Sequence, residues 1–225
     1  MIAADGGAGA SRAGAPPAGA VVLASHNPHK LREVREILAA AAPGLDPAAV
    51  IAAPETGATE PVEDGATFAE NALIKARALA VHTGLPAIAD DSGLAVDILG
   101  GAPGIFSARW CGRHGDDQAN LELLLAQLAD VRPEHRGAGF VCAAALVLPD
   151  GREFVEHGEL RGVLLTAPRG DGGFGYDPIL MPDDQPPVGA QRSCAELTPA
   201  EKNAISHRGK AFRALAPRVV AALQS

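Results

Sequence analysis

An apolar run that leads directly into a helix pattern restricts this chain to the α/β fold class. VVLA (21–24) is typical of a buried strand, and KLREVREILAA (30–40) places apolar side chains at helical spacing. The order then repeats, because a second helix pattern over 67–83 precedes the strand-like run LPAIAD (85–90). Strands that alternate with helices predict one sheet with helices packed against it.

The middle and the end of the chain add an antiparallel strand pair and further helices. FVCAAALVL (140–148) and GREFVEHGEL (151–160) read as two strands joined by a turn at 149–151. Amphipathic helices are expected over 117–130 and over 211–223. The sheet should therefore contain both parallel and antiparallel neighbours.

Capping signals and chain length complete the fold prediction. Thr67 with Glu70, and Thr198 with Glu201, form capping boxes that begin helices. A chain of 225 residues with 47% hydrophobic content can bury one sizeable core. We expect an α/β fold in a single domain over 21–225, with a mixed, elongated central sheet flanked by helices. The domain should have two lobes, with the active site in the cleft between them.

Composition excludes several classes of protein. The first 20 residues contain 8 Ala, 5 Gly and 2 Pro, so residues 1–20 are expected to form a disordered tail. No run approaches the roughly 18 apolar residues of a membrane span, and no signal peptide is evident, so the cytoplasm is the expected location. A net charge of −8 disfavours a non-specific nucleic-acid binder. The three cysteines are far apart and are expected to be free thiols without a zinc site.

The loop SHNPHK (25–30), between the first strand and the first helix, suits a phosphate group. Asn27 can cap the helix with Pro28 at its first position, which leaves backbone N–H groups free to bind an anion. Ser25 adds a hydroxyl and Lys30 a cation. An ordinary helix cap with a surface lysine is the alternative, and the two histidines of this loop are more typical of exposed residues than of a metal pair.

Two acidic patches could hold a divalent cation. Asp90 and Asp91 stand at the end of a predicted strand, where ligands of open α/β sheets collect, so these two adjacent carboxylates could hold one Mg²⁺ and activate water. A turn is the alternative, because Asp-Ser-Gly is good turn chemistry. The second patch lies over 60–64, just before the capped helix. Magnesium takes one or two carboxylates plus phosphate oxygens, so one acid from each patch would suffice. Lys75 could face the same anion or solvent.

A glycine-rich stretch, GGFGYDP (172–178), surrounds a single aromatic side chain. Its glycines also fit the dinucleotide fingerprint G-x-G-x-x-G, but a proline follows where that fingerprint requires a helix. A flexible loop is the ordinary alternative. Phe174 among glycines could instead stack on a nucleobase. Positive charge and hydrogen-bond donors gather in EKNAISHRG (201–209), at Lys202, His207 and Arg208.

Taken together, the motifs resemble the inosine triphosphate pyrophosphatase family, the dITP/XTP pyrophosphatases, over about residues 21–215. The motifs that carry the resemblance are SHNPHK, TFAENALIKA, AIADDSGLAVDILGGAPGIFSARW, GGFGYDP and AELTPAEKNAISHRGKA. The resemblance implies a homodimeric α/β enzyme that uses Mg²⁺ to hydrolyse ITP, dITP and XTP to the monophosphate and pyrophosphate.

The same resemblance implies roles for individual residues. Asp91 matches the general base and a metal ligand, and Glu63 matches the second metal ligand. The positions that match substrate contacts are Ser25, His26, Asn27, Pro28, His29, Lys30, Lys75, Ser92, Phe174, Gly175, Tyr176, Asp177, Lys202, His207 and Arg208.

The sequence departs from the family pattern at two places, and two other functions are alternatives to this hypothesis. Ser25 and His26 stand where many relatives carry Thr-Gly, and the proline-rich stretch around 185–192 is longer than usual. A house-cleaning pyrophosphatase for modified pyrimidine triphosphates would share the opening strand, loop and helix, but SHRG and GGFGYD argue against it. A non-catalytic nucleotide sensor would lack the carboxylate pair, and both Asp90 and Asp91 are present.

Overall fold

The computed structural model describes residues 19–26, 28–41, 46–185 and 191–224. Residues 1–18 of the predicted disordered tail lie outside the described residues. Ala20, which was also assigned to that tail, is buried. Residues 186–190 of the proline-rich stretch also lie outside them. Among the described helices, none has the length and apolar character that would carry it across a membrane.

Six strands form one mixed sheet in the order β2-β1-β3-β4-β5-β6. β1 is parallel to β2 and β3, and the strands from β3 to β6 are antiparallel neighbours, which confirms the predicted mixed sheet and its strand pair. The strands are β1 (Val21–Leu23), β2 (Val50–Ala52), β3 (Ala87–Val96), β4 (Gly137–Val147), β5 (Glu153–Leu164) and β6 (Leu180–Pro182).

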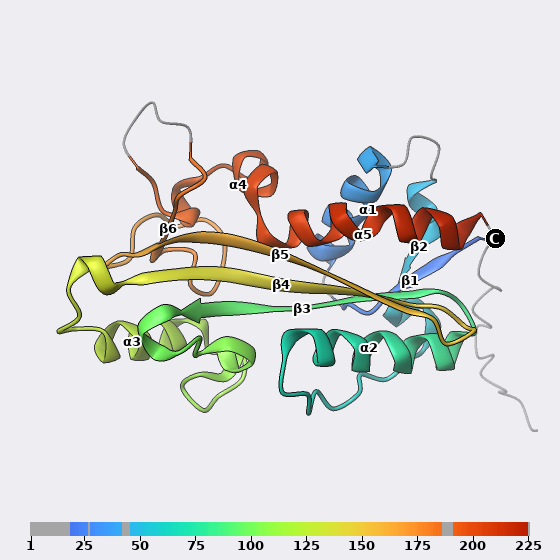
Figure 1. Ribbon diagram of the computed structural model, residues 1–225, viewed down its shortest axis with the longest axis horizontal. Helices are drawn as coiled ribbons and strands as arrows, with labels where there is room; N and C mark the ends of the chain where they lie inside the picture. Colours follow the sequence, from blue (N-terminus) through green and yellow to red (C-terminus); the bar gives the residue numbers. More distant parts are fainter. Residues whose placement is uncertain (1–18, 27, 42–45, 186–190, 225) are drawn as a thin grey trace, which may run out of the picture.

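Helices cover both faces of this long sheet, with α2 and α3 on one face and α1 and α5 on the other (Figure 1). Side chains alternate along β4, so that Cys142 and Ala144 join the core under α1 and α5 while Ala143 and Ala145 join the core under α2. The helices are α1 (Pro28–Ala41), α2 (Phe68–Thr83), α3 (Asp117–Gln127), α4 (Pro199–Ile205) and α5 (His207–Leu223).

Local capping chemistry sets several helix ends. The Thr67 hydroxyl accepts the Glu70 N–H at 3.1 Å, and Gly84, with φ of 67°, ends α2 in the left-handed conformation. The Glu70 carboxylate accepts the N–H of Ala66 and not that of Thr67, so this capping box differs from the predicted one. The box predicted at Thr198 has both of its hydrogen bonds.

The last helix is longer than the sequence pattern suggested. It was expected over 211–223, but α5 begins at His207 because the Ser206 hydroxyl caps it by accepting the Gly209 N–H at 2.9 Å. Pro217 lies inside the helix. His207 and Arg208 therefore stand in the first turn of α5.

The prediction that a strand ends at Asp90 is wrong, and so is the alternative of an Asp-Ser-Gly turn. β3 continues to Val96 because residues 90–96 pair with residues 144–138 of β4 in an unbroken antiparallel ladder. Glycine is needed at position 93 because of close packing and not because of a turn. A Cβ there would lie 2.4 Å from the Ser107 hydroxyl oxygen, which packs directly against the strand at this point.

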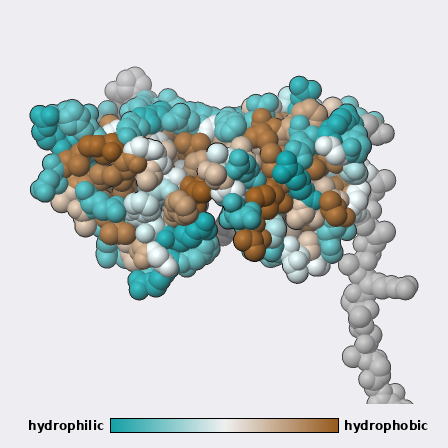
Figure 2. Space-filling model, turned by 60° about the horizontal axis from the view of Figure 1, so that its bottom comes forward, coloured by the Kyte–Doolittle hydropathy of each residue, from teal (hydrophilic) through white to brown (hydrophobic). Residues whose placement is uncertain are grey.

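β3 extends past the end of its parallel neighbour. The pairing of β1 with β3 stops at Leu23 and Ile88, so Asp90 and Asp91 lie beyond the carboxyl end of β1 with β4 on one side only. Ligands of open α/β sheets collect at such an edge. Figure 2 shows the face of α2 and α3, where apolar patches lie over each end and the surface is hollowed between them.

Candidate active site

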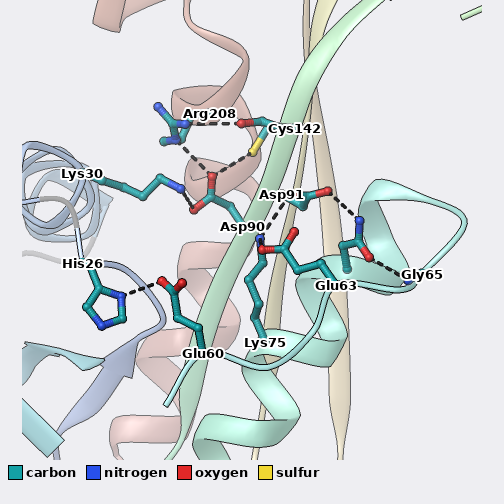
Figure 3. A network of polar contacts seen from close by, with 12 residues as sticks. His26, Lys30, Glu60, Glu63, Gly65, Lys75, Asp90, Asp91, Cys142 and Arg208 are labelled. Carbon is teal, nitrogen blue, oxygen red and sulfur yellow. Dashed lines mark hydrogen bonds and ion pairs between the residues drawn. The ribbon is translucent and has the colours of Figure 1, made fainter. Parts of the chain in front are cut away.

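Asp90 and Asp91 point to opposite faces of the sheet. Successive side chains of a strand alternate between its faces, and both residues lie inside β3 (Figure 3). Asp90 faces Lys30 of α1 and Arg208 of α5, whereas Asp91 faces Lys75 of α2. The hypothesis that the adjacent carboxylates could hold one cation together is therefore wrong for this pair.

Asp90 is a buried anion shared by two cations. Its side chain has no exposed surface, and its carboxylate lies 2.8 Å from Lys30 Nζ and 3.1 Å from Arg208 Nε. Burial alone would raise the pKa of Asp90, but the two neighbouring cations outweigh it and hold that pKa well below its ordinary range. Arg208 also donates to the Ser92 hydroxyl at 3.3 Å and lies 3.4 Å from Glu33. Asp90 thus joins a residue of the predicted phosphate loop to a residue of the predicted base site.

On the opposite face, Lys75 bridges two carboxylates. Its Nζ lies 3.2 Å from Asp91 Oδ1 and 3.2 Å from Glu63 Oε1, and the Asn71 amide donates to Asp91 Oδ2 at 3.2 Å. Burial raises the pKa of Asp91, and Glu63 adds to that rise although Lys75 opposes it. Burial would lower the pKa of Lys75, but the carboxylates of Asp91 and Glu63 raise it. Two predicted metal ligands and a predicted phosphate-binding lysine therefore converge.

The donor set at this point fits magnesium. Within the described residues, no group of three or more His, Cys, Asp or Glu side chains could enclose a metal ion. Magnesium does not need one, because it binds through one or two carboxylates and completes its shell with water and phosphate oxygens. Glu63 and Asp91 are two such carboxylates, each within reach of the same ammonium group of Lys75. The pair suits a cation that arrives with a phosphate ligand.

A pocket with a cavity of about 220 Å³ lies next to Arg208 and Ser92. Phe174 lines it with 66% of its surface exposed, and Lys202 Nζ lies 5.3 Å from the centre of that ring. His207 stacks on Phe140 at 5.1 Å, and its Nδ1 has no hydrogen-bond partner among the described residues. Burial lowers the pKa of His207 to about 3, so its imidazole is neutral at physiological pH.

Asp177 organises the glycine-rich loop around Phe174. Its Oδ2 accepts the Phe174 N–H at 2.7 Å and the Lys202 ammonium at 2.5 Å. Gly173 has φ of 74°, and a Cβ there would lie 2.1 Å from that same oxygen. The glycine is required so that the backbone can approach the carboxylate and leave the Phe174 ring at the pocket surface.

Gly175 and Tyr176 of this loop also line the pocket, and each is hydrogen-bonded to a neighbouring segment. The Gly175 N–H donates to Asp117 Oδ2 at 3.1 Å, which ties the loop to the start of α3. The Tyr176 hydroxyl donates to the Ser107 carbonyl at 3.0 Å, and burial raises the pKa of Tyr176. The hydroxyl of Tyr176 therefore anchors the loop, and its buried ring forms part of the pocket wall.

The predicted phosphate loop is only partly described. Ser25 is buried directly after β1, and its N–H donates to the Leu23 carbonyl at 2.8 Å. His26 is exposed and lies 2.6 Å from Glu60, so its ring contacts the second acidic patch. Asn27, and with it the predicted cap, lies outside the described residues, as do the side chains of Pro28 and His29.

Sequence reasoning missed several residues of this site. Glu33 balances Arg208, Asp117 holds Gly175, and Asn71 donates to Asp91. Only Asn71 carried a signal. It precedes Lys75 by four residues in a helix pattern, so the two side chains had to share a helix face. Glu33 and Asp117 look like ordinary surface acids until the tertiary structure brings their partners near.

Comparisons with known proteins show the family of this chain. Residues 21–218 match the Ham1 family. The chain is 63% identical to a dITP/XTP pyrophosphatase of Streptomyces coelicolor and 62% identical to one of Frankia alni; the matches cover 88% and 87% of this chain and 96% and 95% of those proteins.

Two solved structures share the fold. A HAM1 protein from Coxiella burnetii superposes with a TM-score of 0.78 at 41% identity, covering 90% of this chain and 98% of that one. A nucleoside-triphosphatase, dITP/XTP pyrophosphatase, from Mycobacterium abscessus gives a TM-score of 0.70 at 51% identity, covering 88% and 97%. These matches confirm the resemblance carried by the motifs, and the chain belongs to the Ham1 family.

Proposed function

We propose that this chain hydrolyses deaminated purine nucleoside triphosphates, namely ITP, dITP and XTP, to the monophosphate and pyrophosphate with Mg²⁺. The observation that carries the proposal is the combination of a Glu63–Lys75–Asp91 centre with a pocket lined by Phe174 and a neutral His207. Relatives that are 63% and 62% identical are named dITP/XTP pyrophosphatase, which supports the same reaction here.

Glu63 and Asp91 would hold the magnesium ion together with phosphate oxygens of the substrate. Bound there, the ion supplies positive charge to the phosphates as negative charge develops on them. Lys75 adds a second positive charge at the same point, and its raised pKa keeps it protonated. These charges favour the transition state more than the ground state, which is the requirement for catalysis.

Asp91 would act as the general base toward the attacking water. Burial raises the pKa of Asp91 above its ordinary value, and a more basic carboxylate accepts a proton more readily. Lys75 holds Oδ1 and Asn71 holds Oδ2, so the orientation of the carboxylate is set before substrate binds. Preorganisation of this kind avoids reorganisation cost during the reaction.

The triphosphate would extend from this centre toward the start of α1. Lys30 is held by Asp90 at the open edge of β3, and the backbone N–H groups at the start of a helix favour an anion. The remaining phosphate-loop positions belong to the same proposal: Ser25, His26, Asn27, Pro28 and His29. Ser92, hydrogen-bonded to Arg208, would lie between the phosphate and base sites.

The base would stack on Phe174 beside Lys202 and Asp177. A purine presents a flat face to an exposed aromatic ring, and such stacking tolerates any base. Discrimination against ATP would come from donors near His207 and Arg208 that pair with a 6-oxo group. A 6-amino group would leave those donors without a partner, which can lower kcat/KM by orders of magnitude. Gly175 and Tyr176 would shape the wall of this subsite.

The proposal includes the arrangement of the whole molecule. The active site would lie in a cleft between two lobes of one domain over 21–225, and the hollow between the α2 and α3 ends supports this (Figure 2). We place the enzyme in the cytoplasm as a homodimer, in keeping with a role in cleaning the nucleotide pool. Sedimentation of the purified chain would test the dimer.

Pyrophosphate release across a panel of nucleotides tests the reaction. ITP, dITP, XTP, GTP, ATP, dUTP and CTP are incubated with Mg²⁺, and phosphate is measured with and without added inorganic pyrophosphatase. We expect phosphate only with the coupling enzyme, and mainly from the first three nucleotides. Preference for a pyrimidine would replace the proposal with a modified-pyrimidine pyrophosphatase, and nucleotide binding without turnover would identify a sensor.

A further inference from the structure

Asn71 connects the two segments that carry the metal-binding carboxylates. It is the fourth residue of α2, and only 1% of it is exposed. Its Oδ1 accepts the Gly65 N–H at 2.9 Å, and its Nδ2 donates to Asp91 Oδ2 at 3.2 Å. A buried amide is costly unless both of its ends are hydrogen-bonded, and here both ends serve the site.

Glycine at position 65 allows the segment before α2 to pack closely against Asn71. A Cβ at position 65 would lie 2.7 Å from Asn71 Oδ1 and 2.7 Å from Glu70 Cβ, well inside contact distance. The segment can therefore approach α2 only with glycine at this position. Glu63 is two residues earlier, so the approach of Gly65 also determines where the Glu63 carboxylate meets Lys75.

We infer that Asn71 is a positioning residue that sets the arrangement of Glu63 and Asp91 for the divalent cation. One amide fixes the Asp91 carboxylate from one side and the Glu63 segment from the other. The inference rests on the proposed function, since it concerns the cation of that same site. Hydrogen bonds that orient metal ligands typically change metal affinity or activity by about 10- to 100-fold when they are removed.

A purely structural role for Asn71 is the competing explanation, and the chain contains a matched control for it. Asn120 is the fourth residue of α3, is also 1% exposed, and accepts the Cys111 N–H at 2.7 Å through its Oδ1. Its Nδ2 has no hydrogen-bond partner among the described residues. Like Asn71, Asn120 thus accepts a backbone N–H from the loop that precedes its helix. Unlike Asn71, it donates to no carboxylate of the site.

The test compares Asn71→Ala with Asn120→Ala. Mn²⁺ affinity is measured by electron paramagnetic resonance in the presence of inosine α,β-methylene triphosphate, which is not cleaved, and stability is measured by urea unfolding. Both variants should lose stability, because each leaves a backbone N–H without its partner. Only Asn71→Ala should bind Mn²⁺ about 10- to 100-fold more weakly, while Asn120→Ala stays within about twofold of the wild type.

A second variant covers the case in which Asn71→Ala does not fold. Gly65→Ala keeps the amide but pushes the Glu63 segment away from it, so Mn²⁺ affinity should fall by a similar factor. Wild-type Mn²⁺ affinity in either folded site variant, or an equal loss in Asn120→Ala, would overturn the inference. Turnover of ITP by the wild type is measured alongside; its absence would refute the proposed function and leave the Mn²⁺ comparison to decide the role of Asn71.

Discussion

Replacing Asp90 by Asn should destabilise the protein far more than replacing an exposed partner of an ion pair. The Asp90 side chain is fully buried between Lys30 at 2.8 Å and Arg208 at 3.1 Å. Asparagine preserves the shape but removes the negative charge, so two cations remain beside a neutral amide. Removing one partner of a buried ion pair typically costs about 3–5 kcal/mol, because the remaining charge is buried without compensation.

The surroundings place the expected loss at the lower end of that range. Lys30 is 21% exposed and can turn toward water, and Arg208 keeps Glu33 at 3.4 Å. We expect the free energy of unfolding to fall by about 3 kcal/mol, which corresponds to roughly 6–12 °C in Tm for a chain of this size. Urea unfolding at pH 7 measures the first quantity and calorimetry the second.

The pH dependence of the same variant has a definite sign. Because the folded-state pKa of Asp90 lies below its ordinary value of 3.8, its contribution is fully present above that value and is lost as pH falls through the folded-state pKa. The difference between wild type and Asp90→Asn should therefore stay constant from pH 8 to pH 5 and shrink below pH 4.

Asp97 supplies the control for this prediction. It forms an ion pair with Arg161 in which both side chains are about half exposed, so Asp97→Asn should cost less than about 1 kcal/mol. If Asp90→Asn cost no more than Asp97→Asn at pH 7, the charge of Asp90 would not stabilise the fold in the way described.

Three further outcomes are expected. Asp91→Asn should lower kcat for ITP with Mg²⁺ at least about 100-fold with an unchanged circular dichroism spectrum, since it removes the base; near-normal turnover would exclude that role. Phe174→Ala should weaken ITP binding, measured by calorimetry, by about 1–3 kcal/mol without improving ATP turnover; unchanged binding would place the base elsewhere. Lowering the pH from 7 to 5 should destabilise the wild type by up to about 2 kcal/mol more than His207→Gln. The half-buried His207 has a pKa of about 3 and is neutral in the folded chain, so folding must release a proton that the unfolded chain retains below pH 6.5. Equal urea-unfolding losses in both proteins would contradict this last prediction.

Short-range chemistry decided most of what could be predicted from the sequence. The caps at Thr67 and Thr198, the turn between β4 and β5, and the apolar periodicities are each set by residues a few positions apart. The five motifs likewise pointed to the family because each is a local pattern of residue types. Such features can be recognised in the sequence because residues close together along the chain determine them.

The arrangement of the site depended on contacts between distant segments. β3 runs past Asp90 because β4 pairs with it, and β1 ends early enough to expose that edge. This continuation sends Asp90 to Lys30 and Arg208 and Asp91 to Lys75, although the two acids are adjacent in sequence. Which face each carboxylate occupies follows from strand pairing, and the local sequence at Asp90 and Asp91 wrongly predicted that the strand ends there.

The sequence by itself therefore determined the residue types that this chemistry needs and the helix that presents Lys75. Only the tertiary structure decided which of the two carboxylates remains buried between cations and which one meets Glu63. The physical reason is that burial and charge at these positions are set by segments 16 to 118 residues apart, such as Lys75 with Asp91 and Arg208 with Asp90. Burial and partner charges are what fix the protonation state of a carboxylate, and both exist only in the folded chain.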